Sequence, residues 1–423
     1  MADFFSEEVV IDILRRLPVK ALLRCTSVCK SWYILITSPE FISSHLNFAA
    51  DSKKRTPFLL LRRRVRNSER YDLYSDNESF ARISTFEFPF RSINSWFTIV
   101  GSCNGLLCLS DDRVYYMHTV ILWNPCIKKS VLLPKPNLIY SSYGSFMQTL
   151  GFGFDPTASD YKVIRITYVD CGRGLPQVEL YRLSTGVWQD LSFLALEYVI
   201  YNRSRQAYVN GATHWIARST DCYDLIVLFD MCGEVFQEMM LPVTLVDNDS
   251  TRSKDLVVYK ESLAVIAWSV SGPEPGLVVW VMNEYGVESS WTKHFNIDLH
   301  EFGRGYVRPL WIRKHGEVIT VWQDGSLIAY DHDGAEVKDL GVHGSRCEDY
   351  RRSVHVDGYM KSLVLLEKSS WFSDAITRIK LPALQTDDCD SIDAGSYGSD
   401  CEHSSESDYK HGHGSYGGLF TRQ

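Results

Sequence analysis

The architecture of the N-terminal part is decided by the stretch Leu14-Arg-Arg-Leu17-Pro18-Val19-Lys-Ala-Leu22-Leu23-Arg-Cys25, followed by Val28-Cys29-Lys30-Ser31-Trp32. Apolar residues recur at helical spacing from Val9 to Leu17, and Pro18 ends this helix because proline lacks a backbone donor. A second apolar stripe continues from Val19 to Trp32. The pattern predicts three or four short helices. A segment of about fifty residues cannot bury all of this apolar surface, so we expect its spare face to bind a partner.

The composition predicts an intracellular globular protein. The chain has 423 residues, of which 45% are hydrophobic, so we expect one small and one large domain. Its net charge of −8 disfavours a general nucleic-acid-binding protein. Eleven cysteines without a regular frame favour reduced thiols, in the cytoplasm or the nucleus or both. No apolar run approaches the ~20 residues of a membrane helix, so we expect no membrane association.

From about residue 97 the pattern changes to β-structure. Short runs of Val, Ile, Trp, Tyr and Phe alternate with Gly, Asn and Asp turns. Hairpins are predicted at Asn104-Gly105, Asn210-Gly211 and Asp357-Gly358, because these pairs tolerate the positive φ of a two-residue turn. Strand aromatics recur about every 48–58 residues, at Trp123, Tyr181, Phe229, Trp280 and Tyr330.

This period is typical of a propeller with four strands in each blade. Five such units fit between residues 97 and 341, and a sixth forms if 353–367 joins the strands around 58–86. The predicted fold is therefore an α+β multidomain chain, with a small N-terminal all-α domain followed by an all-β propeller of six blades, the sixth of which is closed by both chain ends. A two-sheet sandwich and an irregular barrel remain open alternatives. The predicted domains are 1–48 (helical), 49–57 (linker), 58–381 (propeller) and 387–423 (a disordered acidic tail).

The order of turns predicts two different propeller faces. In an up-and-down blade the first and third turns share one end, where the tight glycine turns fall. The longer segments fall at the other end, and binding surfaces concentrate on such loops. We therefore expect client contacts there from Tyr140, Tyr143, Arg173, Tyr223, Asp247, Arg252, Glu274, Arg304, Arg346 and Tyr350.

The sequence offers no arrangement typical of catalysis, and we expect no catalytic residue, metal or cofactor. Cys103 and Cys108 are predicted to be core thiols, and His214 a hydrogen-bonded strand residue. His411-Gly-His413 is a weak metal motif. A propeller that acts as an enzyme or a small-molecule sensor stays a minor alternative.

Two parts of the chain resemble known modules. The N-terminal stretch resembles an F-box through Ile13-Leu14, Leu17-Pro18, Leu22-Leu23 and Val28–Trp32, although Phe4-Phe5 replaces the Leu-Pro that begins many F-boxes. The remainder, through about residue 367, resembles the F-box-associated domain of plant F-box proteins, a kelch-like group that includes S-locus and defence-related members. This resemblance is carried by Gly101–Leu109, Leu122–Pro125, Gly151–Asp155 with Asp160–Val163, and Trp280–Tyr285 with Ser290–Lys293.

The resemblance implies a non-catalytic substrate-recognition subunit of an Skp-cullin-F-box ubiquitin ligase. An Skp-family adaptor would bind the F-box and connect it to the cullin and RING subunits, while the propeller would hold a client protein of unknown identity. The implied adaptor-binding residues are Leu14, Leu17, Pro18, Val19, Leu22, Leu23, Val28, Cys29, Lys30 and Trp32. The alternative is a propeller interaction protein that never enters a ligase.

Overall fold

The computed structural model describes residues 6–50, 58–65, 68–90, 97–111, 119–137, 146–169, 175–194, 197–200, 204–246, 253–269, 275–299, 307–322, 324–331, 336–344 and 354–366. The statements that follow concern these residues. None of the helices within them is long and apolar enough to cross a membrane.

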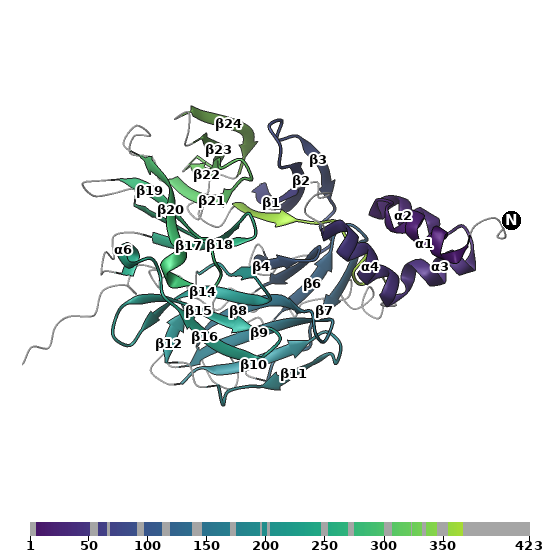
Figure 1. Cartoon of the computed structure of the whole chain (residues 1–423), viewed down its shortest axis with the longest axis horizontal. Helices are drawn as coiled ribbons and strands as arrows, with labels where there is room; N and C mark the ends of the chain where they lie inside the picture. The colour runs from purple at the N-terminus through teal and green to yellow at the C-terminus, as the bar shows by residue number, and fades with distance from the viewer. Residues whose placement is uncertain are drawn as a thin grey trace, which may run out of the picture. The chain divides into compact units, whose positions relative to one another are not determined.

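Four short helices form the N-terminal domain: α1 (Glu7–Arg15), α2 (Val19–Cys25), α3 (Lys30–Thr37) and α4 (Pro39–Ala50) (Figure 1). The first helix carries acidic residues in its first turn and ends before Pro18. At the start of α4, the Ser38 hydroxyl accepts a hydrogen bond from the backbone N–H of Phe41 at 3.2 Å, and proline occupies the first helical position. The pattern of short helices predicted from the sequence is confirmed.

The rest of the described chain forms six antiparallel sheets, which are the blades of a propeller (Figure 1). Blade 1 combines β1 (Phe58–Val65), β2 (Ser68–Ser75), β3 (Arg82–Phe86) and β25 (Val354–Tyr359). Blade 2 contains β4 (Thr98–Cys103), β5 (Leu106–Ser110), β6 (Val120–Asn124) and β7 (Lys129–Leu132). Blade 3 contains β8 (Phe146–Asp155), β9 (Asp160–Val169), β10 (Gln177–Arg182) and β11 (Val187–Asp190).

The other three blades follow in chain order. Blade 4 contains β12 (Tyr198–Ile200), β13 (Ala207–Val209), β14 (Ala212–Ser219), β15 (Asp224–Asp230) and β16 (Val235–Met239), and the short helix α6 (Val243–Val246) follows it. Blade 5 contains β17 (Ser253–Tyr259), β18 (Ser262–Ser269), β19 (Gly276–Met282) and β20 (Trp291–Asp298), with the 3-10 turn η2 (Glu288–Ser290). Blade 6 contains β21 (Val307–Ile312), β22 (Val318–Trp322), β23 (Ser326–Asp331) and β24 (Glu336–His343).

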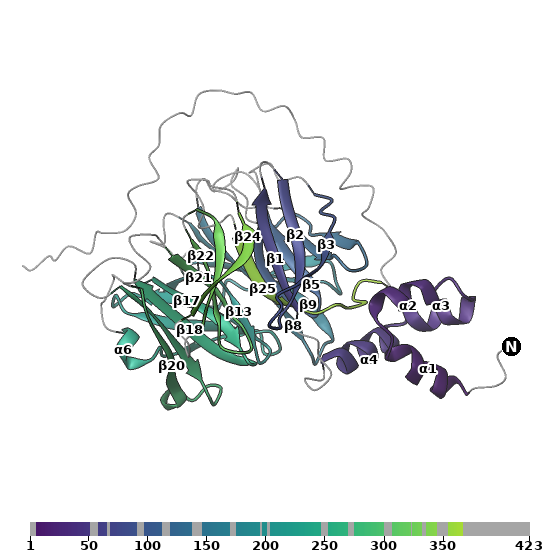
Figure 2. The same cartoon turned by 90° about the horizontal axis from the view of Figure 1, so that it is seen from above.

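Both ends of the propeller meet in blade 1. Strand β25 pairs antiparallel with β1, from Phe58 opposite Tyr359 to Arg63 opposite Val354. Figures 1 and 2 show the yellow-green β25 beside the purple β1. The predicted six-bladed propeller, closed by the two chain ends, is thereby confirmed. The hairpin predicted at Asp357-Gly358 is wrong, because both residues lie inside β25 and pair with β1.

The segment that follows β25 packs against blade 2. The buried side-chain amide of Asn124 donates hydrogen bonds to the carbonyl oxygens of Ser362, at 3.1 Å, and Val364, at 2.9 Å. Gly105 has a φ of 81°, and a Cβ atom there would lie 2.5 Å from the carbonyl oxygen of Met360. A glycine is therefore required at this turn both by its conformation and by the close approach of the backbone.

A buried lysine joins blade 3 to blade 4. The Lys162 ammonium, on β9, lies 2.7 Å from a carboxylate oxygen of Asp155 and 2.7 Å from one of Glu234. It also donates to the carbonyl oxygen of Met231 at 2.6 Å. Its three N–H donors thus all have partners, two of them on the neighbouring blade.

Candidate interaction surfaces

Three of the residues implied for adaptor binding are buried inside the structure. Leu14, Val19 and Leu22 are buried in one apolar cluster that also contains Ile36 and Phe41. These three side chains therefore do not lie on the exposed surface of the domain, and their contact with an adaptor stays a prediction. They sit on the inward side of their helices, where they stabilise the domain.

The remaining seven implied residues lie at or near the surface. Pro18, Val28, Cys29 and Lys30 are exposed, whereas Leu17, Leu23 and Trp32 are half-buried. The structure adds exposed apolar residues that the prediction missed, among them Tyr33 and Ile34 on α3, and Val9 and Ile13 on α1. Ile34 is 67% exposed and Val28 63% exposed. The i, i+4 spacing of Val9 and Ile13 would have identified the outer stripe of α1.

One exposed residue of this surface is a polarised thiol. The Cys29 sulfur lies 3.1 Å from the Ser31 hydroxyl, at the start of α3. Hydrogen bonds from the Ser31 hydroxyl and from the Trp32 backbone N–H lower the pKa of Cys29. The thiolate, which is the reactive form, is therefore more populated here than at an ordinary exposed cysteine.

Strand order gives the propeller two unlike faces. We call the end that carries the first and third turns of each blade, such as Asn104–Gly105, the tight-turn face, and the opposite end the loop face. Phe58, the first residue of β1, is paired with Tyr359, whose hydroxyl lies 3.4 Å from the carbonyl oxygen of Gly105. The chain from the helical domain therefore enters the propeller on the tight-turn face, and the loop face lies at the other end of the strands.

Of the residues predicted to contact a client, only Tyr223 lies within the described part of the chain. It is half-buried, it follows β14 at the loop-face end, and its carbonyl oxygen accepts a hydrogen bond from Ser219 at 2.9 Å. The others lie outside the described residues, namely Tyr140, Tyr143, Arg173, Asp247, Arg252, Glu274, Arg304, Arg346 and Tyr350. The prediction for that set stays a prediction.

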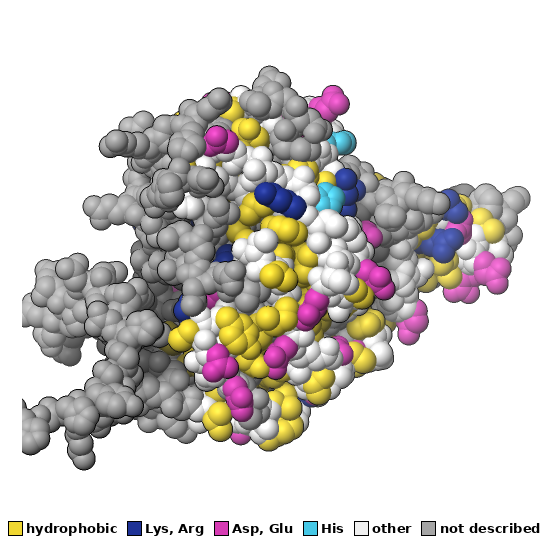
Figure 3. Space-filling view, turned by 60° about the vertical axis from the view of Figure 1, so that its left-hand side comes forward, with side chains coloured by type: hydrophobic (Ala, Val, Ile, Leu, Met, Phe, Trp, Pro, Cys, Tyr) yellow, Lys and Arg dark blue, Asp and Glu magenta, His cyan; other side chains and the backbone are white. Residues whose placement is uncertain are grey.

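The described part of the loop face exposes large apolar side chains. Leu175, before β10, is 68% exposed, and Phe193, after β11, is 76% exposed. Val243 on α6 is 83% exposed. Figure 3 shows one side of the molecule, where apolar side chains lie among acidic ones. Exposed apolar side chains mark a protein-binding surface where they form a contiguous patch.

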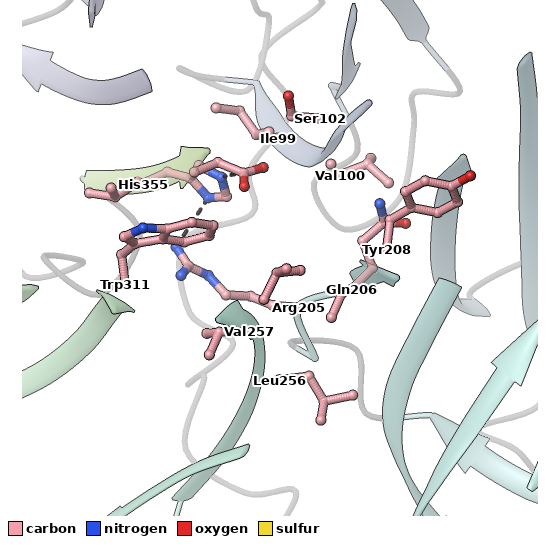
Figure 4. Close-up of a pocket in the computed structure, with 15 residues that line it drawn as sticks. Ile99, Val100, Ser102, Arg205, Gln206, Tyr208, Leu256, Val257, Trp311 and His355 are labelled. Atoms are coloured by element: carbon pink, nitrogen blue, oxygen red, sulfur yellow. Dashed lines mark hydrogen bonds and ion pairs between the residues drawn. The ribbon is translucent and has the colours of Figure 1, made fainter. Parts of the chain in front are cut away.

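A small cavity, lined by both apolar and polar residues, lies among the innermost strands (Figure 4). It has a volume of about 70 Å³ and is lined from β4, β13, β17 and β25, with Trp311 of β21. Within it, a guanidinium N–H of Arg205 donates to Nδ1 of His355 at 3.1 Å, and another donates to the carbonyl oxygen of Leu310 at 2.9 Å. Nε2 of His355 lies 4.0 Å from a carboxylate oxygen of Asp357.

Burial and neighbouring charges set the ionisation of these groups. Burial, together with the positive charges of Arg205, Arg62 and Arg308, holds the pKa of His355 well below its usual value. Its imidazole is therefore neutral and accepts the hydrogen bond from Arg205. Burial raises the pKa of Asp357 to about 7 and lowers that of Arg205 to about 10. Arg205 thus remains charged at neutral pH.

Two cysteines and a histidine that the sequence offers as reactive groups, Cys103, Cys108 and His214, are buried in the propeller. Cys103 and Cys108 are buried in blade 2. The ring of His214 lies 3.0 Å from the carbonyl oxygen of Ala207 and 2.9 Å from the hydroxyl of Tyr285, and burial lowers its pKa to about 4. Within the described ranges no three His, Cys, Asp or Glu side chains are placed to hold a metal ion. His411 and His413 lie outside those ranges.

Comparison with known proteins identifies two domain models in the chain. An F-box domain matches residues 5–44, and an F-box associated beta propeller domain matches residues 58–365. F-box protein At3g07870 of Arabidopsis thaliana is 31% identical, with 81% of this chain and 88% of that protein covered. F-box protein CPR1 of the same plant is 27% identical, with 85% and 88% covered. Among solved structures, SapL1 lectin in complex with alpha methyl fucoside has a TM-score of 0.38 and 10% identity, and the match covers 69% of this chain and 98% of the lectin.

Proposed function

Because the chain belongs to the family of F-box proteins with an F-box-associated β-propeller, we propose that it is the substrate-recognition subunit of an Skp-cullin-F-box ubiquitin ligase. In this role the helical domain binds an Skp-family adaptor and the propeller binds a client protein. Catalysis belongs to the other subunits. Holding the client beside the ubiquitin-charged enzyme converts their encounter into an intramolecular one, with an effective concentration that reaches the mM range.

The observation that carries this proposal is the exposed apolar surface of the helical domain. Val28 and Ile34 are more than half exposed although the domain already has a buried core around Leu14 and Leu22. Burying one such aliphatic side chain fully contributes about 1.5–3 kcal/mol. A few of these side chains, covered together, are enough for the central part of a protein interface.

The layout of the propeller supports the loop face as the client surface. The chain from the helical domain joins the tight-turn face at Phe58, so the loop face is free of this connection. Leu175, Phe193 and Val243 are exposed on it. A client bound there would contact surface that the protein does not use to connect its own domains.

Adaptor binding is tested by mixing the purified chain with a purified Skp-family adaptor and measuring complex formation. Val28→Asp and Ile34→Asp place a charge on the exposed surface and leave the buried core intact. We expect each to weaken adaptor binding by roughly tenfold or more, since desolvating a carboxylate at an interface without a partner costs more than 1.4 kcal/mol. Val243→Asp is the matched control, because it makes the same exchange at a valine of the propeller that is even more exposed.

Two results would contradict the proposal. The first is a wild-type chain that does not bind the adaptor. The second is binding by Val28→Asp and Ile34→Asp that equals that of Val243→Asp, with all variants folded by circular dichroism. The ligase role is then separated from a plain interaction protein by reconstituting the complex with a bound client. Transfer of ubiquitin to that client, dependent on the adaptor, is the expected outcome.

A further inference from the structure

The central cavity contains an arginine whose charge is not matched by a carboxylate partner. Among the described residues, no carboxylate oxygen lies within 4.0 Å of the Arg205 guanidinium, which instead donates to a neutral imidazole and to a backbone carbonyl. A guanidinium has five N–H donors. The described partners use two of them, so the group retains donor capacity toward the cavity.

The other charged groups around the cavity compensate Arg205 only in part, because Asp255 and Asp357 act on its charge without an ion-pair contact. Arg308 lies 3.2 Å from the Asp255 carboxylate, so that acid is already engaged. Arg205 donates to Nδ1 of His355, whereas a carboxylate oxygen of Asp357 lies 4.0 Å from Nε2 of the same ring. Because the pKa of Asp357 is raised to about 7, its carboxyl is partly neutral at physiological pH. A desolvated cation without a full counter-charge is costly, and an incoming anion relieves that cost.

We propose that this cavity is a binding site for a carboxylate group, with Arg205 as its principal donor. A carboxylate is planar and matches the fork of N–H groups that a guanidinium presents. The volume of about 70 Å³ exceeds the ~10–15 Å³ that one water requires, so a small anionic group fits within it. Beside Arg205, Nε2 of His355 is a buried polar atom without a hydrogen-bond partner among the described residues, and the nearest carboxylate oxygen, of Asp357, lies 4.0 Å away.

Two of the lining side chains lie near the loop-face ends of their strands. Arg205 precedes β13, and His355 is the second residue of β25, and these innermost strands both begin at that face. The carboxylate therefore comes either from a free small molecule or from an acidic side chain of a protein bound on the loop face. The inference does not rest on the ligase role, because anion binding is measured on the isolated chain without adaptor or client.

The test is a titration of the full chain with acetate. Binding is measured by saturation-transfer NMR of the acetate methyl signal. We expect saturable binding that Arg205→Gln weakens by roughly tenfold or more, the usual effect of losing a charge-assisted hydrogen bond. Lys128→Gln is the matched control, since it removes an exposed charge that pairs with Glu87 outside the cavity. It should bind acetate as the wild type does.

A second titration distinguishes the two sources. The probes are the capped peptides Ala-Ala-Glu-Ala-Ala and Ala-Ala-Gln-Ala-Ala. Tighter binding of the Glu peptide than of acetate, with none for the Gln peptide, assigns the site to a protein side chain. Binding of acetate alone assigns it to a free small carboxylate. If neither acetate nor the Glu peptide binds, or if Arg205→Gln binds them as the wild type does, the proposal is overturned.

A crystal of the wild type soaked in acetate covers the case in which Arg205→Gln does not fold. Density for acetate within hydrogen-bond distance of the Arg205 guanidinium is the expected result. Acetate found only elsewhere on the molecule, with the cavity holding water, would overturn the assignment.

Discussion

Replacing Lys162 by methionine should destabilise the propeller strongly, because it removes the cation that two acids from different blades share. The change keeps the length and most of the volume of the side chain, so packing is largely preserved. Breaking a buried ion pair by removing one partner costs about 3–5 kcal/mol. Asp155 keeps its hydrogen bonds from Thr157 and Ala158, and Glu234 keeps its contact with Arg182. We therefore expect the free energy of unfolding to fall by about 3 kcal/mol, the lower end of this range.

The ionisation of Asp155 supports this magnitude. Burial favours the neutral acid, but hydrogen bonds from Lys162 and Thr157 outweigh it and lower the pKa of Asp155 from 3.8 to about 2. A shift of 3.8 − 2, close to two units, corresponds to roughly 2–3 kcal/mol in all, of which the Lys162 hydrogen bond gives the largest single share and the hydrogen bonds from Thr157 and Ala158 the rest. Because the folded pKa is depressed, this stability is present above the unfolded pKa of 3.8 and is lost as the pH falls toward 2. The difference in unfolding free energy between the wild type and Lys162→Met should therefore become smaller as the pH falls.

The assay is urea unfolding followed by circular dichroism, with the midpoint and slope compared between variants. Lys128→Met is the matched control, since its ion pair with Glu87 is exposed and should contribute less than about 1 kcal/mol. In the double variant with Asp155→Asn, the loss should be smaller than the sum of the single losses. A deficit for Lys162→Met no larger than that for Lys128→Met would refute the reasoning.

Three further outcomes follow from the closure of the ring and from the cysteines. Gly186→Ala should lose about 1–2 kcal/mol from its positive φ alone. Gly105→Ala should lose more, because its Cβ would also meet the segment after β25, and equal losses in thermal unfolding would contradict this. Asn124→Ala should speed hydrogen exchange of residues 360–366 and lower stability by about 1–3 kcal/mol, with unchanged exchange as the opposing result. Mass spectrometry after brief iodoacetamide treatment should find Cys29 labelled and Cys108, whose pKa burial raises, unlabelled; the reverse order would be inconsistent with these surroundings.

Much of the propeller could be predicted because one feature repeats along blades 2 to 6. In five of the six blades an aromatic residue lies on the strand next to the outermost one, namely Trp123 on β6, Tyr181 on β10, Phe229 on β15, Trp280 on β19 and Tyr330 on β23. Their spacing is therefore the length of one blade along the chain. The closing strand was predicted by counting, since five complete units left an unpaired segment at each end.

Some turns could not be read from the sequence. The hairpin between β17 and β18 has Lys260 at φ 48° and Glu261 at φ 69°, without glycine or asparagine. Register imposed by the flanking strands here outweighs the local preference. In the opposite sense, Asp357-Gly358 has a strong turn signal but lies inside a strand, because β1 offers a complete set of backbone partners.

The surfaces were harder to predict than the fold. An apolar helical stripe shows which residues avoid water, but it does not show which of them a domain buries itself, so Leu14 and Leu22 could not be told from Val28. The central cavity joins residues more than a hundred positions apart, such as Arg205 and His355. No local sequence pattern predicts a contact between residues so far apart in the chain. Arg205 and His355 come together only when the ring of blades closes.

The pairing of β25 with β1 also determines when the propeller can be completed during synthesis. Phe58 meets Tyr359 only after some 300 further residues have been added, which at ribosomal speeds of about 5–20 residues per second takes roughly 15–60 s. Throughout that interval the Leu59–Leu61 stretch of β1 is an unpaired, apolar sheet edge, the kind of edge that recruits other strands into aggregates. The nascent chain therefore most needs a chaperone at β1, its first strand, until β25 has been synthesised and pairs with it.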